Sequence, residues 1–166
     1  QGTYVTDYRR NGNMDTLLAL LRYNGGVLGK EEIRSILEVR QGLEHMTVSR
    51  AIDCASEEGL LRLGSYVDSL AANPPPAQAA DIAFAFHHDL TILGGNQILP
   101  LIYSSFRVPC TALWIRFCRK YGVEALHGNM EKLYRLILRR DKQGAVAWID
   151  KYLEEAISGS QQIYEA

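Results

Sequence analysis

The sequence predicts an all-α fold, an antiparallel bundle of six to seven helices in a chain of 166 residues. Apolar residues recur at positions i, i+3, i+4 and i+7 over most of the chain, which is the spacing of one helix face. The alternation of apolar and polar residues that is typical of strands is rare, and only residues 3–6 are expected to be extended. Short breaks separate the helical stretches, and short connections favour antiparallel neighbours.

The first half of the chain contains three expected helices. The first covers residues 14–23 and ends at Asn24-Gly25-Gly26, residue types that tolerate a left-handed backbone. The second covers residues 30–55, and two glutamates in its first turn suit the positive end of the helix dipole. Ser56 is expected to cap the third helix, over residues 57–72, by accepting a hydrogen bond from a free backbone N–H.

Three consecutive prolines, at residues 74–76, form the clearest break, because proline cannot continue a helix. The helical pattern resumes soon afterwards, so we expect a connection inside one domain. A later helix begins at Asn96, and Pro100 and Pro109 are expected to kink it. Asp141 is expected to cap the last helix. The helices expected in this half cover residues 77–93, 96–121, 123–140 and 142–158.

The charge balance argues against a chain that binds DNA by itself. Lys and Arg number 18 against 19 Asp and Glu, so the net charge is −1 and no overall field favours nucleic acid or an anionic membrane. A DNA-binding domain usually carries a basic face or tail. No stretch approaches the ~18 apolar residues that a membrane span needs. We therefore expect one globular domain that neither enters a membrane nor binds DNA specifically.

The three cysteines, Cys54, Cys110 and Cys118, are odd in number and lack the spacing of metal ligands. Each lies among apolar residues at helical positions, which predicts buried, reduced thiols in a cytoplasmic protein. The first residues have neither a signal-peptide layout nor an initiator Met, so we expect a fragment of a longer protein.

Arg40 and Glu44 lie four residues apart on a helix face that is partly apolar. This spacing suits an ion pair. A guanidinium on a half-buried face is also a bidentate clamp for a carboxylate or a phosphate. The pair is therefore either structural or part of an anion site, and the spacing leaves both interpretations open.

His87 follows Phe84 and Phe86 and precedes Leu90, which places it near the core. There it is either a hydrogen-bonded packing residue or a ligand-binding residue. Downstream, Gly94-Gly95-Asn96 is expected to end one helix and cap the next. Such a corner also gathers backbone donors that can hold an anion.

No pattern of catalysis is present. The chain lacks a G-x-S-x-G motif, a supported Cys–His arrangement and a glycine-rich phosphate loop, so we expect no catalytic residue and no cofactor. Among His45, His87, His88 and His127, no pair has convincing metal-ligand spacing, and the residue four before His87 is Ala83. A transition-metal site is therefore not expected.

Aromatic and basic residues interleave from Trp114 to Tyr121. Such a stretch can stack on single-stranded nucleic acid. At helical spacing it favours a half-buried helix with its basic side in solvent, or a subunit interface.

Several motifs occur in a characteristic order: Arg40-x-x-Leu43-Glu44, then Phe86-His87-x-x-Leu90 with Gly95-Asn96, then Asp141-x-x-x-Ala145. Gly2-Thr3-Tyr4-Val5, before them, looks like the last strand of a winged-helix wing. Together they resemble the effector-binding domain of FadR-type regulators in the GntR family, over nearly the whole chain.

The resemblance implies that residues 1–12 are the end of a wing and a linker, and that residues 13–166 are an effector-binding and dimerisation domain. The chain would then be the ligand-sensing part of a bacterial transcription regulator, not an enzyme. It would form a homodimer, and DNA would be bound only through a winged-helix domain that precedes it.

The resemblance also implies an effector pocket inside the bundle, in which Arg40 pairs with an acidic group and His87 and Tyr152 supply hydrogen bonds. The effector would be acyl-CoA-like or a carboxylate metabolite. The residues expected to line the pocket are Arg40, Ala83, His87, Asn96, Met130 and Tyr152.

Many members of this family hold a metal through an Asp four residues before the central His and two further His. Here those positions are Ala83, Met130 and Tyr152, so only His87 remains and the metal is not carried over. This loss is similar to the FadR branch, whose pocket accepts fatty acyl-CoA. Two alternatives stay open: a purely structural dimerisation module, and a metal-dependent carboxylate sensor that uses another ligand such as His127.

Overall fold

The structure, a computed structural model, describes residues 7–23 and 28–164. It is all-α, as predicted, and the described residues contain no strand. The strand expected over residues 3–6 lies outside the described residues. The helices are α1 (Tyr8–Asn11), α2 (Met14–Tyr23), α3 (Lys30–Cys54), α4 (Glu57–Arg62), α5 (Gly64–Ala71), α6 (Pro76–Leu93), α7 (Leu99–Ser105), α8 (Arg107–Tyr121), α9 (Val123–Leu138) and α10 (Lys142–Ile157).

Most helix boundaries agree with the sequence pattern, and both predicted caps are confirmed. Ser56 accepts a hydrogen bond from the backbone N–H of Gly59 at the start of α4. Asp141 accepts one from the backbone N–H of Gly144 at the start of α10. Each bond satisfies one of the backbone donors that a helix leaves free in its first turn.

Two predicted helices are each divided in the structure. The helix expected over residues 57–72 breaks at Leu63 into α4 and α5. The helix expected over residues 96–121 is not kinked but divides into α7 and α8 at Phe106. Pro100 and Pro109 lie in the first turns of these two helices, where a missing backbone N–H costs little because it has no partner within the helix.

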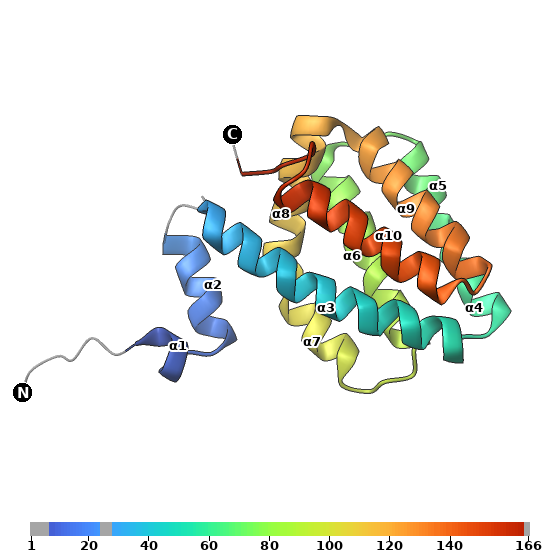
Figure 1. Cartoon of the computed structure of the whole chain (residues 1–166), viewed down its shortest axis with the longest axis horizontal. Helices are drawn as coiled ribbons and strands as arrows, with labels where there is room; N and C mark the ends of the chain where they lie inside the picture. The colour runs from blue at the N-terminus through green and yellow to red at the C-terminus, as the bar shows by residue number, and fades with distance from the viewer. Residues whose placement is uncertain (1–6, 24–27, 165–166) are drawn as a thin grey trace, which may run out of the picture.

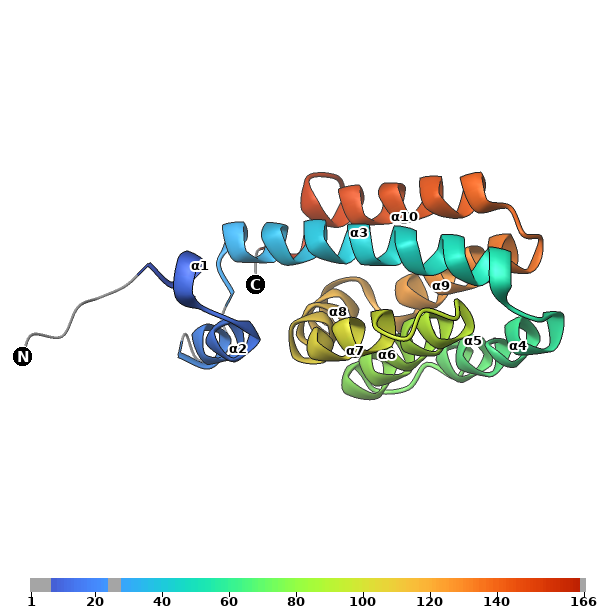
Figure 2. The ribbon, with the colours of Figure 1, turned by 90° about the horizontal axis from the view of Figure 1, so that it is seen from below.

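The long helix α3 organises the bundle. Figures 1 and 2 show α3 antiparallel to α10 along one side, with α6 on its other side, and both packings are extensive. The opposite layer contains α4 to α8, where α6 packs against α8, and α9 packs against both α5 and α10. Buried side chains of all these layers form one hydrophobic cluster. α3 and α10 therefore lie in one layer, and the buried face of α3 covers the core.

The end of α3 is fixed by a side chain from the far part of the chain. Arg140, in the turn between α9 and α10, donates through Nη1 to the backbone carbonyl of Ile52 at 2.5 Å. Through Nη2 it donates to the carbonyl of Ala55 at 2.8 Å. Ile52 lies in the last turn of α3 and Ala55 is its C-cap residue, and carbonyls at this end have no partner within the helix.

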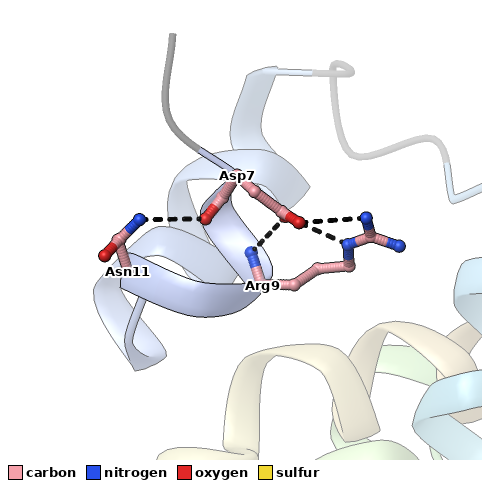
Figure 3. A network of polar contacts seen from close by, with 3 residues as sticks. All are labelled: Asp7, Arg9 and Asn11. Carbon is pink, nitrogen blue, oxygen red and sulfur yellow. Dashed lines mark hydrogen bonds and ion pairs between the residues drawn. The ribbon is translucent and has the colours of Figure 1, made fainter. Parts of the chain in front are cut away.

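The short helix α1 has a local polar network, drawn in Figure 3. The carboxylate of Asp7 accepts hydrogen bonds from the backbone N–H and from the guanidinium of Arg9, each at 3.0 Å. Asn11 donates to the backbone carbonyl of Asp7 at 3.4 Å. In Figures 1 and 2, α1 and α2 lie beside the start of α3, at the edge of the bundle.

The cysteine prediction is right for two thiols and wrong for the third. Cys110 and Cys118 are buried, whereas Cys54 is exposed because it is the last residue of α3 and lies on its solvent side. All three are free thiols. Among the described residues, no helix combines the length and low charge needed to cross a membrane.

Candidate functional site

A stripe of polar side chains on α3 points into the core. Arg40, Glu44 and Thr47 are spaced by four and three residues, which places them on one helix face. All three are buried, and Glu44 is only 1% exposed. Burying two charged groups costs free energy of desolvation, which only close contacts with other polar or aromatic groups can offset.

Arg40 and Glu44 form a buried ion pair at the centre of the bundle. Nε of Arg40 donates to Oε1 of Glu44 at 2.5 Å. The hydroxyl of Tyr152, on α10, donates to the other carboxylate oxygen. The guanidinium lies over the ring of Trp114, on α8, with 4.0 Å between its carbon and the ring centroid, which is a favourable cation–π position. The ion pair is therefore fixed from α3, α8 and α10 together.

His87 approaches the same pair from α6. Its Nε2 lies 3.9 Å from Oε1 of Glu44. The imidazole stacks between the rings of Trp114 and Tyr103, with centroid distances of 5.6 and 6.2 Å. Burial lowers the pKa of His87 to about 4, so the imidazole is neutral at pH 7. The charges at the centre of the site are then one cation and one anion.

Several polar groups around this pair have no hydrogen-bond partner among the described residues. They are the hydroxyls of Thr47 and Tyr103 and Nε2 of His87. The terminal nitrogens of Arg40 also have no acceptor, because its only hydrogen bond within the described part of the chain leaves from Nε. Buried polar groups are normally satisfied, so such a concentration of unpaired groups indicates a place for a polar ligand or water.

Arg40 and His87, but not Thr47 or Tyr103, line a cavity of about 40 Å³. Its polar lining residues are Arg40, His87, Asn129 and Tyr152. The rest of its wall is apolar or aromatic and comes from α3, α8, α9, α10 and the segment after α10. The cavity thus combines one guanidinium and a few hydrogen-bonding groups with an apolar body, as small-molecule sites do.

The structure brings together four of the six residues expected to line a pocket. Arg40, His87, Met130 and Tyr152 all line the cavity, although they come from four different helices. Ala83 is buried on α6 but is not part of the cavity wall.

Asn96, also expected to line the pocket, does not line this cavity. Its Oδ1 accepts hydrogen bonds from the backbone N–H groups of Ile98 and Leu99, each at 2.9 Å. The carbonyl of Gly94 accepts one from Arg50 at 3.1 Å. This corner joins α6 to α7. The backbone N–H groups of Ile98 and Leu99 already donate to Asn96 and are therefore not free to bind an anion.

The residues of the cavity do not fit the metal that many members of the resembled family hold. Of the positions for its ligands, only His87 has a suitable side chain, since Ala83, Met130 and Tyr152 occupy the others. In the part of the chain that the structure describes, no group of three or more His, Cys, Asp or Glu side chains could hold a metal ion. A single neutral imidazole is too few ligands for a divalent ion.

Sequence reasoning missed three contributors to the site. Glu44 appeared as a partner of Arg40 but not as a site residue, although its spacing already placed it on the same face. Trp114 was one member of an aromatic and basic stretch, and the structure shows its ring buried beneath the guanidinium while Arg119 and Lys120 are exposed. No sequence pattern indicated that Asn129 lines the site.

Comparisons with known proteins match most of the chain. A family model described as "FCD domain" matches residues 35–155, which include α4 to α9, most of α3 and α10, and nearly the whole cavity wall. The chain is also similar to "HTH-type transcriptional regulator LutR" of Bacillus subtilis (strain 168). The two are 25% identical over 171 residues, which cover 96% of this chain and 75% of that protein.

Proposed function

Because this chain belongs to the FCD domain family, the C-terminal effector-binding domains of GntR-type transcription regulators, we propose that its cavity binds a small acidic effector. The similar Bacillus protein is named as a transcriptional regulator, which supports a sensing role for this chain rather than a catalytic one. The effector would change how a winged-helix domain, preceding this chain in the full-length protein, binds DNA.

The unpaired terminal nitrogens of Arg40 carry this proposal. A buried guanidinium that lines a cavity and makes a single hydrogen bond, through Nε, presents two parallel donors to a bound carboxylate. Trp114 and Glu44 hold the guanidinium in place, so little side-chain entropy is lost when the ligand binds. The remaining contacts are apolar, apart from His87, Asn129 and Tyr152.

Each of these residues has a proposed role. Nη1 and Nη2 of Arg40 bind the carboxylate, and neutral His87 supplies a hydrogen bond through the unpaired Nε2. Tyr152 orients Glu44 through their hydrogen bond and lies next to the ligand. Met130 forms part of the apolar wall, whereas Ala83 and Asn96 make no contact with the effector.

Straight-chain monocarboxylates from acetate to octanoate, octanoyl-CoA, and the corresponding uncharged amides test this proposal in a thermal-shift assay. At a ligand concentration of about 100 Kd, binding stabilises the folded state by about 2.7 kcal/mol. For a chain of this size that corresponds to a rise in Tm of about 5–10 °C. We expect this rise from at least one acid of the panel and none from its amide.

A matched pair of variants shows whether Arg40 is responsible. Arg40→Lys keeps a cation beside Glu44 but removes the planar fork, so we expect it to fold and to lose most of the ligand-induced rise. Arg50→Lys makes the same change at a residue outside the cavity and should keep the full rise. An equal response of the two variants would remove Arg40 from the site.

We also propose that the chain forms a twofold homodimer, since regulators of this kind read palindromic DNA. Large apolar side chains are exposed where α7 begins and along the first turns of α7 and α8, and Leu101 is 67% exposed. A cluster of this kind is typical of an interaction surface. Its members are Ile98, Leu101, Ile102 and Val108.

Size-exclusion chromatography with light scattering is expected to give the mass of a dimer at micromolar concentration. Leu101→Asp places a charge in the apolar cluster and should give a monomer. Leu61→Asp, at an exposed leucine on α4, should leave the dimer intact. A monomeric wild-type chain would contradict the proposal.

A further inference from the structure

The segment that follows α10 folds back onto the bundle and contributes to the cavity wall. In Figures 1 and 2 it runs from the end of α10 toward the start of α3. Ile163, within this segment, is only 2% exposed and lines the same cavity as Arg40. An aliphatic side chain from outside the helices therefore forms part of the wall of the cavity that Arg40 also lines.

Few polar contacts hold this segment. The carbonyl of Gln162 accepts hydrogen bonds from Nζ of Lys120 at 2.9 Å and from the hydroxyl of Tyr121 at 2.6 Å. Among the described residues, positions 162–164 make no backbone–backbone hydrogen bond. Segments with so few backbone hydrogen bonds open at a low free-energy cost compared with helices of the core.

The segment also contacts the start of α3. The ring of Tyr164 packs on the hydrophobic cluster, and Nζ of Lys30, the first residue of α3, lies 5.2 Å from its centroid. This end of α3 lies beside α1 and α2, the side from which the chain enters the bundle. Any movement of residues 162–164 therefore changes the contact between Tyr164 and Lys30, at the start of α3.

The cavity has room for a few water molecules, so a carboxylate with a longer apolar chain fits only if a side chain moves. Its volume of about 40 Å³ compares with the roughly 10–15 Å³ that one water molecule needs. The other apolar lining residues belong to helices of the bundle, whereas Ile163 lies in a short segment after α10 that has few backbone hydrogen bonds. Arg40 already faces the Glu44 carboxylate, so one ligand carboxylate is a second anion beside it. A dicarboxylate would add a third anion, and the described residues of the wall include no cation besides Arg40.

We propose that Ile163 is a displaceable plug of the effector pocket, and that the effector is a monocarboxylate whose apolar chain takes the place of the Ile163 side chain. This inference rests on the proposed function, because it assumes that Arg40 binds the carboxylate. Entry of the ligand releases residues 162–164 from the bundle and breaks the contact between Tyr164 and Lys30. Binding of a ligand in the pocket thereby removes a contact at the start of α3.

Isothermal titration calorimetry of the purified chain with sodium butanoate and sodium octanoate tests the plug. Ile163→Ala removes most of the plug, so we expect octanoate to bind at least about tenfold more tightly than to the wild type, the gain from about two further buried methylene groups. Butanoate affinity should change less than about threefold. Ile149→Ala, the same truncation at a buried residue of α10 outside the cavity, should keep the wild-type ratio of the two affinities.

Hydroxyl-radical footprinting of the wild-type chain gives a second measurement. Octanoate is expected to raise the labelling of the Ile163 and Tyr164 side chains, because Ile163 is buried in the free chain. If both acids bind but Ile163→Ala keeps the wild-type ratio, or octanoate protects Ile163 and Tyr164 from labelling, the plug is overturned and the proposed function stands. If no carboxylate binds the wild type or Ile163→Ala, both proposals are overturned.

Discussion

Arg40→Met is expected to lower the free energy of unfolding by about 3–5 kcal/mol at pH 7. The substitution leaves the carboxylate of Glu44 buried with only the Tyr152 hydroxyl as a direct hydrogen-bond partner. An uncompensated buried charge is among the costliest changes that a core can undergo. Urea denaturation followed by circular dichroism measures the loss.

Two controls separate the buried charge from the loss of a side chain. Arg34→Met breaks an exposed pair with Glu38 on the same helix at the same spacing, and should cost no more than about 0.5 kcal/mol. The double variant Arg40→Met/Glu44→Leu removes both buried charges and should return to within about 1 kcal/mol of the wild type. If Arg40→Met costs no more than Arg34→Met, the ion pair is not buried as the structure has it.

If the double variant regains the stability of the wild type, the ion pair has a role other than stabilising the fold. An ion pair that apolar residues can replace without loss of stability is not retained for stability. The double variant should then fold normally and give no thermal shift with any carboxylate, because it lacks the guanidinium.

The stability of the chain is expected to fall by about 3 kcal/mol between pH 6.5 and pH 4 through His87 alone. Burial lowers its pKa from 6.5 to about 4 in the folded state. In this window the unfolded chain binds a proton at His87 that the folded chain does not. Protonation therefore favours unfolding as the pH falls, and the contribution is fully present above pH 6.5.

Denaturant titrations at several pH values measure this slope, and two variants assign it. His87→Phe keeps an aromatic ring between Trp114 and Tyr103 but cannot titrate, so its stability should depend less on pH in this range. His88→Gln, at the neighbouring half-buried histidine that contacts Ser104, should keep the wild-type slope. An identical slope in His87→Phe and the wild type would show that His87 is not buried in its neutral form.

Much of the fold could be predicted because its signals are local. The apolar period of 3.6 residues defined α2, α3 and α6 closely, and the capping side chains of Ser56 and Asp141 form the expected bonds. The apolar period alone does not report the breaks at Leu63 and Phe106. The first stands next to Gly64 and the second three residues before Pro109, which has to lie in the first turn of a helix.

The site was predictable only in part, for a similar reason. Arg40, His87, Met130 and Tyr152 were identified through the family resemblance, and the structure places all four on one cavity. The contribution of Ile163 depends on how the segment after α10 folds back, which no periodicity in the sequence reports.

The two hydrogen bonds from Arg140 fix the C-terminal end of α3, so we expect any tilt of this helix to move mainly its N-terminal end. With its end held through the carbonyls of Ile52 and Ala55, a tilt of α3 pivots about that end. The helix has 25 residues and so a length of about 37 Å at 1.5 Å per residue, and a tilt of about 5° moves its far end by about 3 Å. Arg40 lies between the fixed end and Lys30, nearer to Lys30. When the helix tilts, Lys30 therefore moves further than Arg40 does.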